Sequence, residues 1–332
     1  MLLFAVNPSA GNGRGKRAWS IVEAELNRRS IAYEAIILNN MENAYKEMSD
    51  RLEKLGPQGT GKLDAIAVIG GDGTLHGLLP LFVGSGVPVG IIPAGSGNDT
   101  ARHFRIPHKP LAALRKLLDG RAVPIDLIRT KLKLPSASSQ ADQDELQRPS
   151  FTITAVAAGF DSAIAAAVDR SFYKSWCNRL GIGSFAYVIG VLQTLFAYRP
   201  TAIEVTIDGV MQRFERSWLS AIASTSSYGG GLRICPEANA ADGKLDICIV
   251  HSCSTLQLLF LLPTLLLGAH TKLRYVTMLQ GASVRLRPVP VKSGKGEASL
   301  NHPIEAYGDG ERLGEVPLES VVLPSSLRFI SG

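Results

Sequence analysis

The stretch that decides the fold is DAIAVIGGDGTLHGLLPLF, residues 64–82. Its first seven residues, 64–70, form a short apolar run that is typical of a buried strand. Leu75, Leu78, Leu79 and Phe82 then recur at the spacing of one helix face. The glycine-rich turn GGDGT at 70–74 joins the strand to this helix. A strand, a tight turn and a helix in this order are the repeating unit of a parallel sheet covered by helices.

The same pattern repeats on both sides of this stretch. It predicts further strands and helices at Leu2–Val6, Arg17–Arg29, Ile31–Leu38, Glu42–Leu55 and Val87–Ile92. After Gly120 the sequence changes to short alternating strands such as FTITAVAAG at 151–159, with helical windows at about 162–172 and 180–197. We therefore predict an α/β domain at 1–124, which 313–332 could complete, and a β-rich domain at 125–312. The polar segment 135–149 is predicted to be a long loop without chemistry.

The composition is that of a globular protein with two domains. Of 332 residues, 45% are hydrophobic and 19% are charged, which excludes a disordered chain. The 35 Lys+Arg and 29 Asp+Glu residues give a net charge of +6, which suits an anionic membrane or a nucleotide but decides neither. The four cysteines form no C-x-x-C pair, so neither a thiol function nor a zinc site is expected.

We expect neither a secretory leader nor a membrane-spanning helix, and therefore a cytoplasmic protein. The longest apolar stretch, Leu256–Ala269, is shorter than the roughly 20 residues that span a bilayer, and it contains Pro263. A helix bent at Pro263 and buried in the core is the main interpretation. The alternative is that an exposed face here, or at Leu180–Tyr198, docks to a membrane.

Three glycine-rich turns follow predicted strands at their carboxyl ends, where open α/β sheets bind ligands. They are NPSAGNG at 7–13, GGDGT at 70–74 and PAGSGND at 93–99. Glycine lets the backbone approach a phosphate closely, and the free N–H groups at a helix start attract negative charge. One such turn would be only a tight connection, but three on one sheet edge predict a phosphate pocket. The segment AGNGRGKR at 10–17 lacks the first glycine and the final Ser/Thr of a Walker loop.

Asp72 is the unusual residue among these turns. A carboxylate would repel phosphates unless a cation lay between them, so Asp72 implies magnesium. The alternative is that Asp72 caps a helix that begins near Thr74.

Together these motifs carry a resemblance to a known family. N-P-x-x-G at 7–11, G-G-D-G-T at 70–74 and G-S-G-N-D at 95–99 resemble the diacylglycerol kinase catalytic domain, in its soluble bacterial lipid kinase branch. The resemblance continues through Y-G-G-G, P-x-A, D-G-x-L-D and D-G-E, at 228–231, 236–238, 242–246 and 309–311.

The resemblance implies a Rossmann-like three-layer α/β domain followed by a C-terminal β-sandwich domain, with ATP in the cleft between them. It implies transfer of the γ-phosphate of ATP to a lipid hydroxyl, of the diacylglycerol type, with Mg²⁺ as cofactor. The expected partners are ATP, a membrane lipid and, transiently, an anionic membrane surface. The protein would then be peripheral at the inner membrane surface, would bind no nucleic acid, and could form a homodimer.

The family's functional positions carry over to named residues. ATP contacts fall on Asn7, Pro8, Ser9, Ala10, Gly11, Gly70, Gly71, Asp72, Gly73, Thr74, Leu75, His76, Ser96 and Asn98, with Asn39 or Asn40 in the place of a usual Thr. The general base falls on Glu311, with Asp309 and Asp126 as the next catalytic candidates beside Asp72. A structural magnesium site falls on the Asp242 side chain, with carbonyls near Asn239 and Lys244.

The residues can also be interpreted without the family. An alcohol is a poor nucleophile at neutral pH, so a carboxylate must accept its proton, and Glu311 could do so. On its own Glu311 is also a typical exposed turn acid. Asp126 could join a magnesium network or accept hinge amides, and Asp242 and Asp246 are typical of a D-G turn between strands.

The sequence departs from the family pattern at a few positions. His76-Gly77 replace a common Asn-Glu pair, Ser96 replaces Thr, Ala10 replaces a frequent Ser, and 292–303 looks like an insertion. Two alternatives therefore stay open: an NAD kinase, which shares the G-G-D-G turn, and a catalytically silent nucleotide-binding regulator. The acceptor could be diacylglycerol, a sphingoid base, phosphatidylglycerol or an isoprenoid alcohol.

Overall fold

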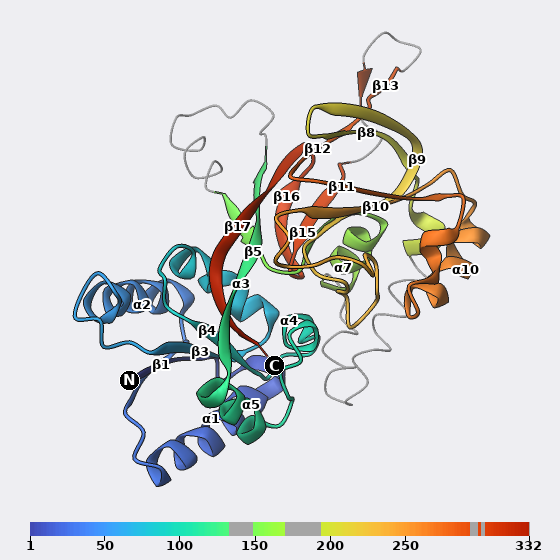
Figure 1. Cartoon of the computed structure of the whole chain (residues 1–332). Coiled ribbons are helices and arrows are strands. Elements are labelled where there is room, and N and C mark those ends of the chain that lie inside the picture. The colour runs from blue at the N-terminus through green and yellow to red at the C-terminus, as the bar shows by residue number, and fades with distance from the viewer. Residues whose placement is uncertain (133–148, 170–193, 293–297, 300–302, 332) are drawn as a thin grey trace. The chain divides into compact units, whose positions relative to one another are not determined.

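The computed structural model describes residues 1–132, 149–169, 194–292, 298–299 and 303–331. The chain divides into two compact units. Unit 1 contains Met1–Leu127, Gly229–Gly231 and Leu323–Gly332, and unit 2 contains Ile128–Tyr228 and Leu232–Val322. Two long strands, β5 (Arg121–Leu132) and β17 (Leu318–Ser331), begin in one unit and end in the other (Figure 1). The terminal segment that the sequence left open therefore contributes to both units.

Unit 1 is built on a parallel sheet in the order β17–β4–β3–β1–β2. Besides β17, the strands of this sheet are β1 (Leu2–Val6), β2 (Tyr33–Ile37), β3 (Ala65–Gly70) and β4 (Val89–Pro93). β1, β3 and β4 are buried along their whole length, as expected of parallel strands with both faces covered. Val6 pairs with Ile69, and Ile69 pairs with Ile92, so these strands end level with one another.

The helices of unit 1 are α1 (Ala10–Arg28), α2 (Met41–Leu55), α3 (Asp72–Phe82), α4 (Asp99–His103) and α5 (Pro110–Asp119). Residues 11–13 in α1 have φ values of 56°, 59° and 83°, so the regular helix begins only after this turn. The sequence analysis missed α4 because five residues are too few to show a period. It also missed α5, although Pro110 and the spacing of its leucines are typical helix signals.

Unit 2 is mainly antiparallel, and its central strands β7 and β10, with the second half of β9, are buried on both faces. Its main path is β16–β15–β7–β9–β8–β12–β17, with β10 joining β9 to β11 and β6 pairing with β5. The strand bounds are β6 (Ser150–Thr152), β7 (Ala155–Gly159), β8 (Thr201–Ile207), β9 (Val210–Ala223), β10 (Leu245–His251), β11 (Val276–Gly281), β12 (Ser283–Pro288), β15 (Glu305–Gly308) and β16 (Glu311–Glu315). The hairpin of β13 (Val291–Lys292) and β14 (Ala298–Ser299) forms a separate small sheet.

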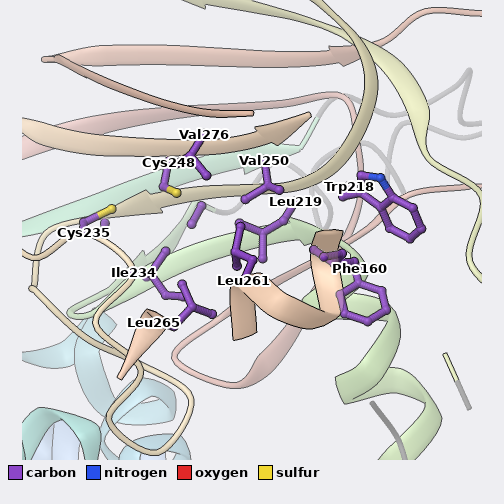
Figure 2. Close-up of a cluster of buried hydrophobic side chains, with 14 of the residues drawn as sticks. Phe160, Trp218, Leu219, Ile234, Cys235, Cys248, Val250, Leu261, Leu265 and Val276 are labelled. Atoms are coloured by element: carbon purple, nitrogen blue, oxygen red, sulfur yellow. The ribbon is translucent and has the colours of Figure 1, made fainter. Parts of the chain in front are cut away.

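Alternation along β9 and β10 creates two apolar layers. Ala221 and Cys248 belong to one buried cluster, while their neighbours Ile222 and Ile247 belong to another. Figure 2 shows the first cluster, where Leu261 and Leu265 of α10 (Thr255–Leu265) accompany side chains from the strands. Helix α7 (Phe160–Asp169) adds Phe160 to the same cluster. The parallel sheet of unit 1 confirms the predicted α/β domain. The two apolar layers of unit 2 confirm that a β-sandwich-like domain follows it.

Several predictions fall on residues that the structure does not describe. They are most of the loop at 135–149, positions 170–172 and 180–193 of the predicted helices, and most of the insertion at 292–303. Where residues are described, α7 begins at Phe160 and 194–197 are helical. Among the described helices, none has both the length and the apolar character that a bilayer crossing needs.

Candidate active site

The three glycine-rich turns of unit 1 meet at the level carboxyl ends of β1, β3 and β4. A Cβ atom at Gly71 would lie 2.8 Å from the Cα of Gly95, and one at Gly95 would lie 2.5 Å from the Cα of Gly71. A Cβ atom at Gly11, where φ is 56°, would lie 2.0 Å from the carbonyl oxygen of Ala94. The turns thus contact one another through backbone that no side chain could replace, as the prediction of one shared pocket requires.

Asn7 holds the first turn to the second. Its Nδ2 donates to Thr74 Oγ1 at 2.9 Å. Its Oδ1 accepts the N–H groups of Ser9 and Ala10, both at 3.1 Å, and the Ser9 hydroxyl at 2.8 Å. This one amide therefore fixes the path of the chain around Pro8.

Asn98 closes the third turn. It adopts a left-handed conformation, with φ of 52°, and is buried. Its Oδ1 accepts the Gly95 N–H at 2.9 Å and its Nδ2 donates to the Gly95 carbonyl at 2.8 Å. Ser96 is left exposed at the tip of the turn. The hydrogen bonds of Asn98 therefore shape the loop and leave the side chain of Ser96 accessible.

Arg14 is a cation among these turns that the sequence analysis did not select. Its Nη2 donates to the Gly95 carbonyl at 2.7 Å, and its Nε donates to the Gly11 carbonyl at 3.0 Å. The guanidinium therefore links the first and third turns and places positive charge where phosphates are expected. The signal was present in AGNGRGKR, where three basic residues stand among glycines.

Asp72 caps a helix, but not the helix that was predicted. Helix α3 begins at Asp72 itself, so a cap for a helix starting near Thr74 is wrong. Instead, Oδ2 of Asp72 accepts the N–H of Asp99 and Oδ1 accepts the N–H of Thr100, both at 3.0 Å, at the start of α4. Each carboxylate oxygen has a second lone pair, so these two bonds leave acceptor capacity for a cation.

Asp99 is a second carboxylate beside Asp72. Its side chain forms an ion pair with Arg102, and its Oδ2 accepts the N–H of Gly230 at 2.9 Å. Burial raises the pKa of Asp99, the nearby charge of Asp72 raises it further, and the Gly230 hydrogen bond and Arg102 oppose the shift. A Cβ atom at Gly97 would lie 3.3 Å from Asp72 Oδ2 and 3.4 Å from Asp99 Oδ2.

The carboxylates of Asp72 and Asp99 therefore both lie beside Gly97. Two negative charges in the same place favour binding of a divalent cation between them. Asp99 ends the G-S-G-N-D motif, which was the signal that could have selected it. The Gly229–Gly231 segment that reaches it has φ values of 64°, 84° and 103° and belongs to unit 1.

The other predicted ATP contacts are of several kinds. Leu75 is buried in the core of unit 1, so its side chain is not available to a ligand, while His76 is half-buried on α3. Asn40 is exposed and its Oδ1 accepts the Asn43 N–H at 3.4 Å, at the start of α2.

The late D-G-E motif lies in unit 2, in the turn between β15 and β16. Asp309 has φ of 51°, and its carboxylate accepts the N–H groups of Ile153 at 2.9 Å and of Thr154 at 2.7 Å. The Thr154 hydroxyl also donates to it, at 2.6 Å. Glu311 is the first residue of β16 and is exposed. Of the two carboxylates, Asp309 is the one that holds the turn.

Asp126 is buried on β5, with 2% of its surface exposed. Its Oδ1 accepts the N–H of Ser325 on β17 at 2.8 Å. This contact supports the interpretation in which Asp126 accepts an amide rather than joining a magnesium network.

The predicted structural magnesium residues lie in the turn before β10. Asp242 Oδ1 accepts the Lys244 N–H at 3.0 Å, and Asn239 Oδ1 accepts the Ala241 N–H at 3.2 Å. Asp246 was predicted to lie in this turn, which is wrong, because it is the second residue of β10 and is buried. The D-G pair ends the turn, and the alternation of β10 then places Asp246 in the sheet.

An acidic environment surrounds this turn. Oδ2 of Asp246 is a buried oxygen that finds no hydrogen-bond partner among the described residues. Burial raises the pKa of Asp246, the side chain of Gln280 opposes this shift by hydrogen bonding, and the charges of Asp242 and Glu237 raise the pKa further. Within the described residues, His, Cys, Asp and Glu side chains do not form a ready-made group of three around a metal. A cation here would therefore need carbonyl oxygens as well as Asp242, which is the type of ligand that magnesium accepts.

Unit 2 also contains a hydrogen-bonded pair of Tyr228, the first residue of the Y-G-G-G motif, and Asp161, which the sequence analysis did not select. Tyr228 donates its hydroxyl hydrogen to Asp161 Oδ2 at 2.6 Å, and the Ser162 N–H donates to Asp161 Oδ1 at 2.8 Å. The pair lies beside an aromatic group in which Phe160 contacts Trp218 with ring centroids 6.0 Å apart. Burial in this setting raises the pKa of Asp161 to about 6.

We expect Asp161→Asn to become more stable than wild type as pH rises. Between an unfolded pKa of 3.8 and a folded pKa of about 6, folded Asp161 keeps a proton that the unfolded chain has lost, so wild-type stability falls across this window. Asparagine does not titrate. The variant should therefore gain about 1–3 kcal/mol in free energy of unfolding relative to wild type between about pH 4 and pH 7. Urea unfolding of both proteins at both pH values measures this, and a pH-independent difference would contradict it.

Comparison with known proteins agrees with this architecture. Residues 1–130 match the family model described as the diacylglycerol kinase catalytic domain, and 154–331 match the YegS C-terminal NAD kinase beta sandwich-like domain. A diacylglycerol kinase of Mycobacterium tuberculosis strain CDC 1551 is 33% identical over 325 residues, covering 98% of this chain and 93% of that protein. The Bacillus subtilis protein YtlR is 24% identical over 98% of both chains. A crystal structure from Bacillus anthracis strain Sterne has a TM-score of 0.73 at 18% identity, covering 100% of this chain and 95% of that one.

The two family matches, together with a relative that is 33% identical over nearly the whole chain, define a phosphotransferase with an alcohol acceptor. The chain belongs to the diacylglycerol kinase catalytic-domain family, in its bacterial lipid kinase branch, and is a lipid kinase. Membership in a kinase family implies ATP as the phosphate donor. The relatives thus favour the lipid kinase over the NAD kinase.

Proposed function

We propose that this lipid kinase transfers the γ-phosphate of ATP to the hydroxyl of a diacylglycerol-type lipid at a membrane surface. The observation that carries the proposal is the meeting of three glycine-rich turns around Arg14 at the carboxyl ends of β1, β3 and β4. Backbone N–H groups and a guanidinium suit the phosphates of a nucleotide. Diacylglycerol is proposed because the relative with 33% identity carries that name.

We further propose that Mg²⁺ accompanies ATP and is held near Asp72 and Asp99. Their oxygens face the glycine at position 97, and the pKa of Asp99 is raised partly by the charge of Asp72, so a cation would relieve a repulsion that is present in the protein. When bound, magnesium would neutralise phosphate charge during transfer. A second, structural Mg²⁺ is proposed at Asp242, with carbonyls near Asn239 and Lys244. The buried Oδ2 of Asp246, to which no described residue donates, supports an acidic setting there.

The chemistry assigned to this chain's own residues is limited to three steps. The turns and Arg14 hold the phosphates, with Ser96 as a further hydroxyl donor. Asp72 and Asp99 orient the phosphate-bound cation. Glu311, which is exposed, accepts the proton of the lipid hydroxyl as it attacks the γ-phosphate. We also propose that the protein contacts anionic lipid transiently and that two copies can form a homodimer.

ATP should bind more tightly with magnesium than with excess chelator. The physical reason is that two neighbouring carboxylates repel the phosphates unless a cation lies between them. Isothermal calorimetry of ATP in both buffers tests this, with AMP as the control, because one phosphate has less charge for the cation to bridge. Equal ATP affinity in the two buffers would overturn the cation at Asp72.

A further inference from the structure

Helix α10 of unit 2 is apolar on two opposite faces. Leu258, Leu261 and Leu265 are 2%, 2% and 4% exposed and belong to the buried cluster of Figure 2. On the other side, Leu256 and Phe260 are 66% and 74% exposed. A capping box of Ser254 and Gln257 fixes the start of the helix, so the exposed residues stand on a regular, anchored element.

The exposed apolar side chains form one continuous stripe. Leu256, Leu259 and Phe260 are followed at three- and four-residue intervals by Pro263. Leu266 and Leu267, in the turn directly after α10, extend this exposed apolar segment and are 61% and 80% exposed. We call Leu256, Leu259, Phe260, Leu266 and Leu267 the docking ridge. Water-facing helix surfaces are normally polar, so a contiguous ridge of this kind marks a contact surface.

The charge around the docking ridge has one dominant sign. From 247 to 296 the chain contains no Asp or Glu. Lys272 and Arg274 follow α10 through the 3₁₀ turn η1 (Ala269–Lys272) and are exposed. Arg233 is also exposed, and its N–H donates to the Leu265 carbonyl at 2.9 Å at the end of α10. Glu237 is an exposed acid that follows Pro236 at the same end of α10. Before the start of α10, the carbonyl groups of Glu215 and Arg216 accept hydrogen bonds from Ser252, which adds one charge of each sign. Among the described residues around the ridge, this gives four cations to two carboxylates.

We propose that the docking ridge inserts into the leaflet of an anionic bilayer that faces the protein, while Arg233, Lys272 and Arg274 contact lipid headgroups. Aliphatic and phenyl side chains on an exposed helix face suit acyl chains, and flanking cations suit anionic headgroups. The proposal rests on the proposed function, because a kinase whose acceptor is a membrane lipid must meet that lipid at the bilayer. It goes beyond it by assigning the surface.

The test is co-sedimentation with vesicles, without ATP or diacylglycerol. The ridge variant is Leu256→Ser/Phe260→Ser. The matched control is Val210→Ser/Met211→Ser, because Val210 and Met211 are exposed to a similar degree, 64% and 59%, on β9 of the same unit. With vesicles of equal phosphatidylcholine and phosphatidylglycerol, the ridge variant should bind at least roughly 10-fold more weakly, and the control should bind within about 2-fold of wild type.

A charge variant separates the two parts of the surface. Lys272→Gln/Arg274→Gln should lose most of the preference for phosphatidylglycerol over pure phosphatidylcholine vesicles, while residual binding to the neutral vesicles is unchanged. All the substituted residues are exposed, so the melting temperatures of the variants should match wild type. These matched melting temperatures ensure that a loss of binding reports the surface rather than the fold.

Two outcomes would overturn the proposal. One is a ridge variant that binds anionic vesicles as tightly as wild type. The other is a wild-type dimer without lipid that the ridge variant converts to a monomer in analytical ultracentrifugation, since the ridge would then cover a second copy. Phosphate transfer to a water-dispersed short-chain diacylglycerol should be equal in wild type and ridge variant. If neither wild type nor the ridge variant transfers phosphate, the proposed function is wrong. The vesicle experiment then still tests the docking ridge on its own.

Discussion

Glu311→Gln should lower turnover by roughly 10²- to 10⁴-fold while leaving ATP affinity nearly unchanged. An alcohol does not attack a phosphate readily while it holds its proton, so a base at Glu311 would contribute only as the reaction proceeds. Glutamine keeps the shape of the side chain but cannot accept the proton. Steady-state turnover with dispersed diacylglycerol, together with calorimetry of ATP, measures the two effects separately.

Glu315→Gln is the matched control, because Glu315 is the last residue of the same strand, β16, and is also exposed. Its turnover should stay within about 2-fold of wild type, as expected of a surface substitution. Near-normal turnover of Glu311→Gln would exclude the base assignment. Asp309 and Asp126 would then be the next candidates, although each already accepts backbone N–H groups, from Ile153 and Thr154 in one case and Ser325 in the other.

Asp72→Asn should fail differently, with weaker binding of magnesium-ATP and lower stability. The amide removes the negative charge proposed to hold the cation, so ATP affinity should fall by about 10-fold or more, and turnover with it. Asparagine has one acceptor oxygen, while α4 offers Asp72 the N–H groups of both Asp99 and Thr100. The lost cap should cost about 1–2 kcal/mol in free energy of unfolding.

Asp208→Asn separates these two effects. Asp208 lies in unit 2, outside the glycine-rich turns, and its carboxylate also accepts two backbone N–H groups. Its Oδ1 accepts both of them, from Ala282 at 3.1 Å and Ser283 at 2.8 Å, and Oδ2 shares the Ala282 N–H at 3.1 Å. Asparagine keeps one acceptor oxygen, so Asp208→Asn should lose at most as much stability as Asp72→Asn and should keep wild-type ATP affinity. If Asp72→Asn, like Asp208→Asn, loses stability but keeps wild-type ATP affinity, Asp72 only caps a helix and the cation assignment is wrong.

Local patterns were sufficient to predict the sheet of unit 1. Short apolar runs predicted to end at Val6, Gly70 and Ile92 are buried parallel strands, and their level register places the following turns together. Because that register follows from strand ends that are visible in the sequence, the meeting of the three turns could be predicted without coordinates, whereas a phosphate bound there stays a prediction. The β-sandwich needed the family resemblance, since alternation alone indicates strands but not how they pair.

The contacts of individual side chains could not be predicted in the same way. Asp72 caps a helix that begins 27 residues later, and Asp99 meets a glycine 131 residues further along. Such partners depend on tertiary packing, for which neither spacing nor propensity carries a signal. Arg14 and α5 are different, because the sequence does contain a signal for each of them. These signals are the basic residues in the glycine-rich turn and the leucine pattern that begins at a proline.

The measurement that tests the central claim most directly is transfer of labelled phosphate from ATP to a panel of acceptors in one set of mixed micelles. The panel contains diacylglycerol, a sphingoid base, phosphatidylglycerol and an isoprenoid alcohol, with NAD offered in parallel. We predict magnesium-dependent label in the product of diacylglycerol and none in the product of NAD. Label in NAD, or in none of the acceptors with ATP still bound, would contradict the account in favour of an NAD kinase or a silent regulator.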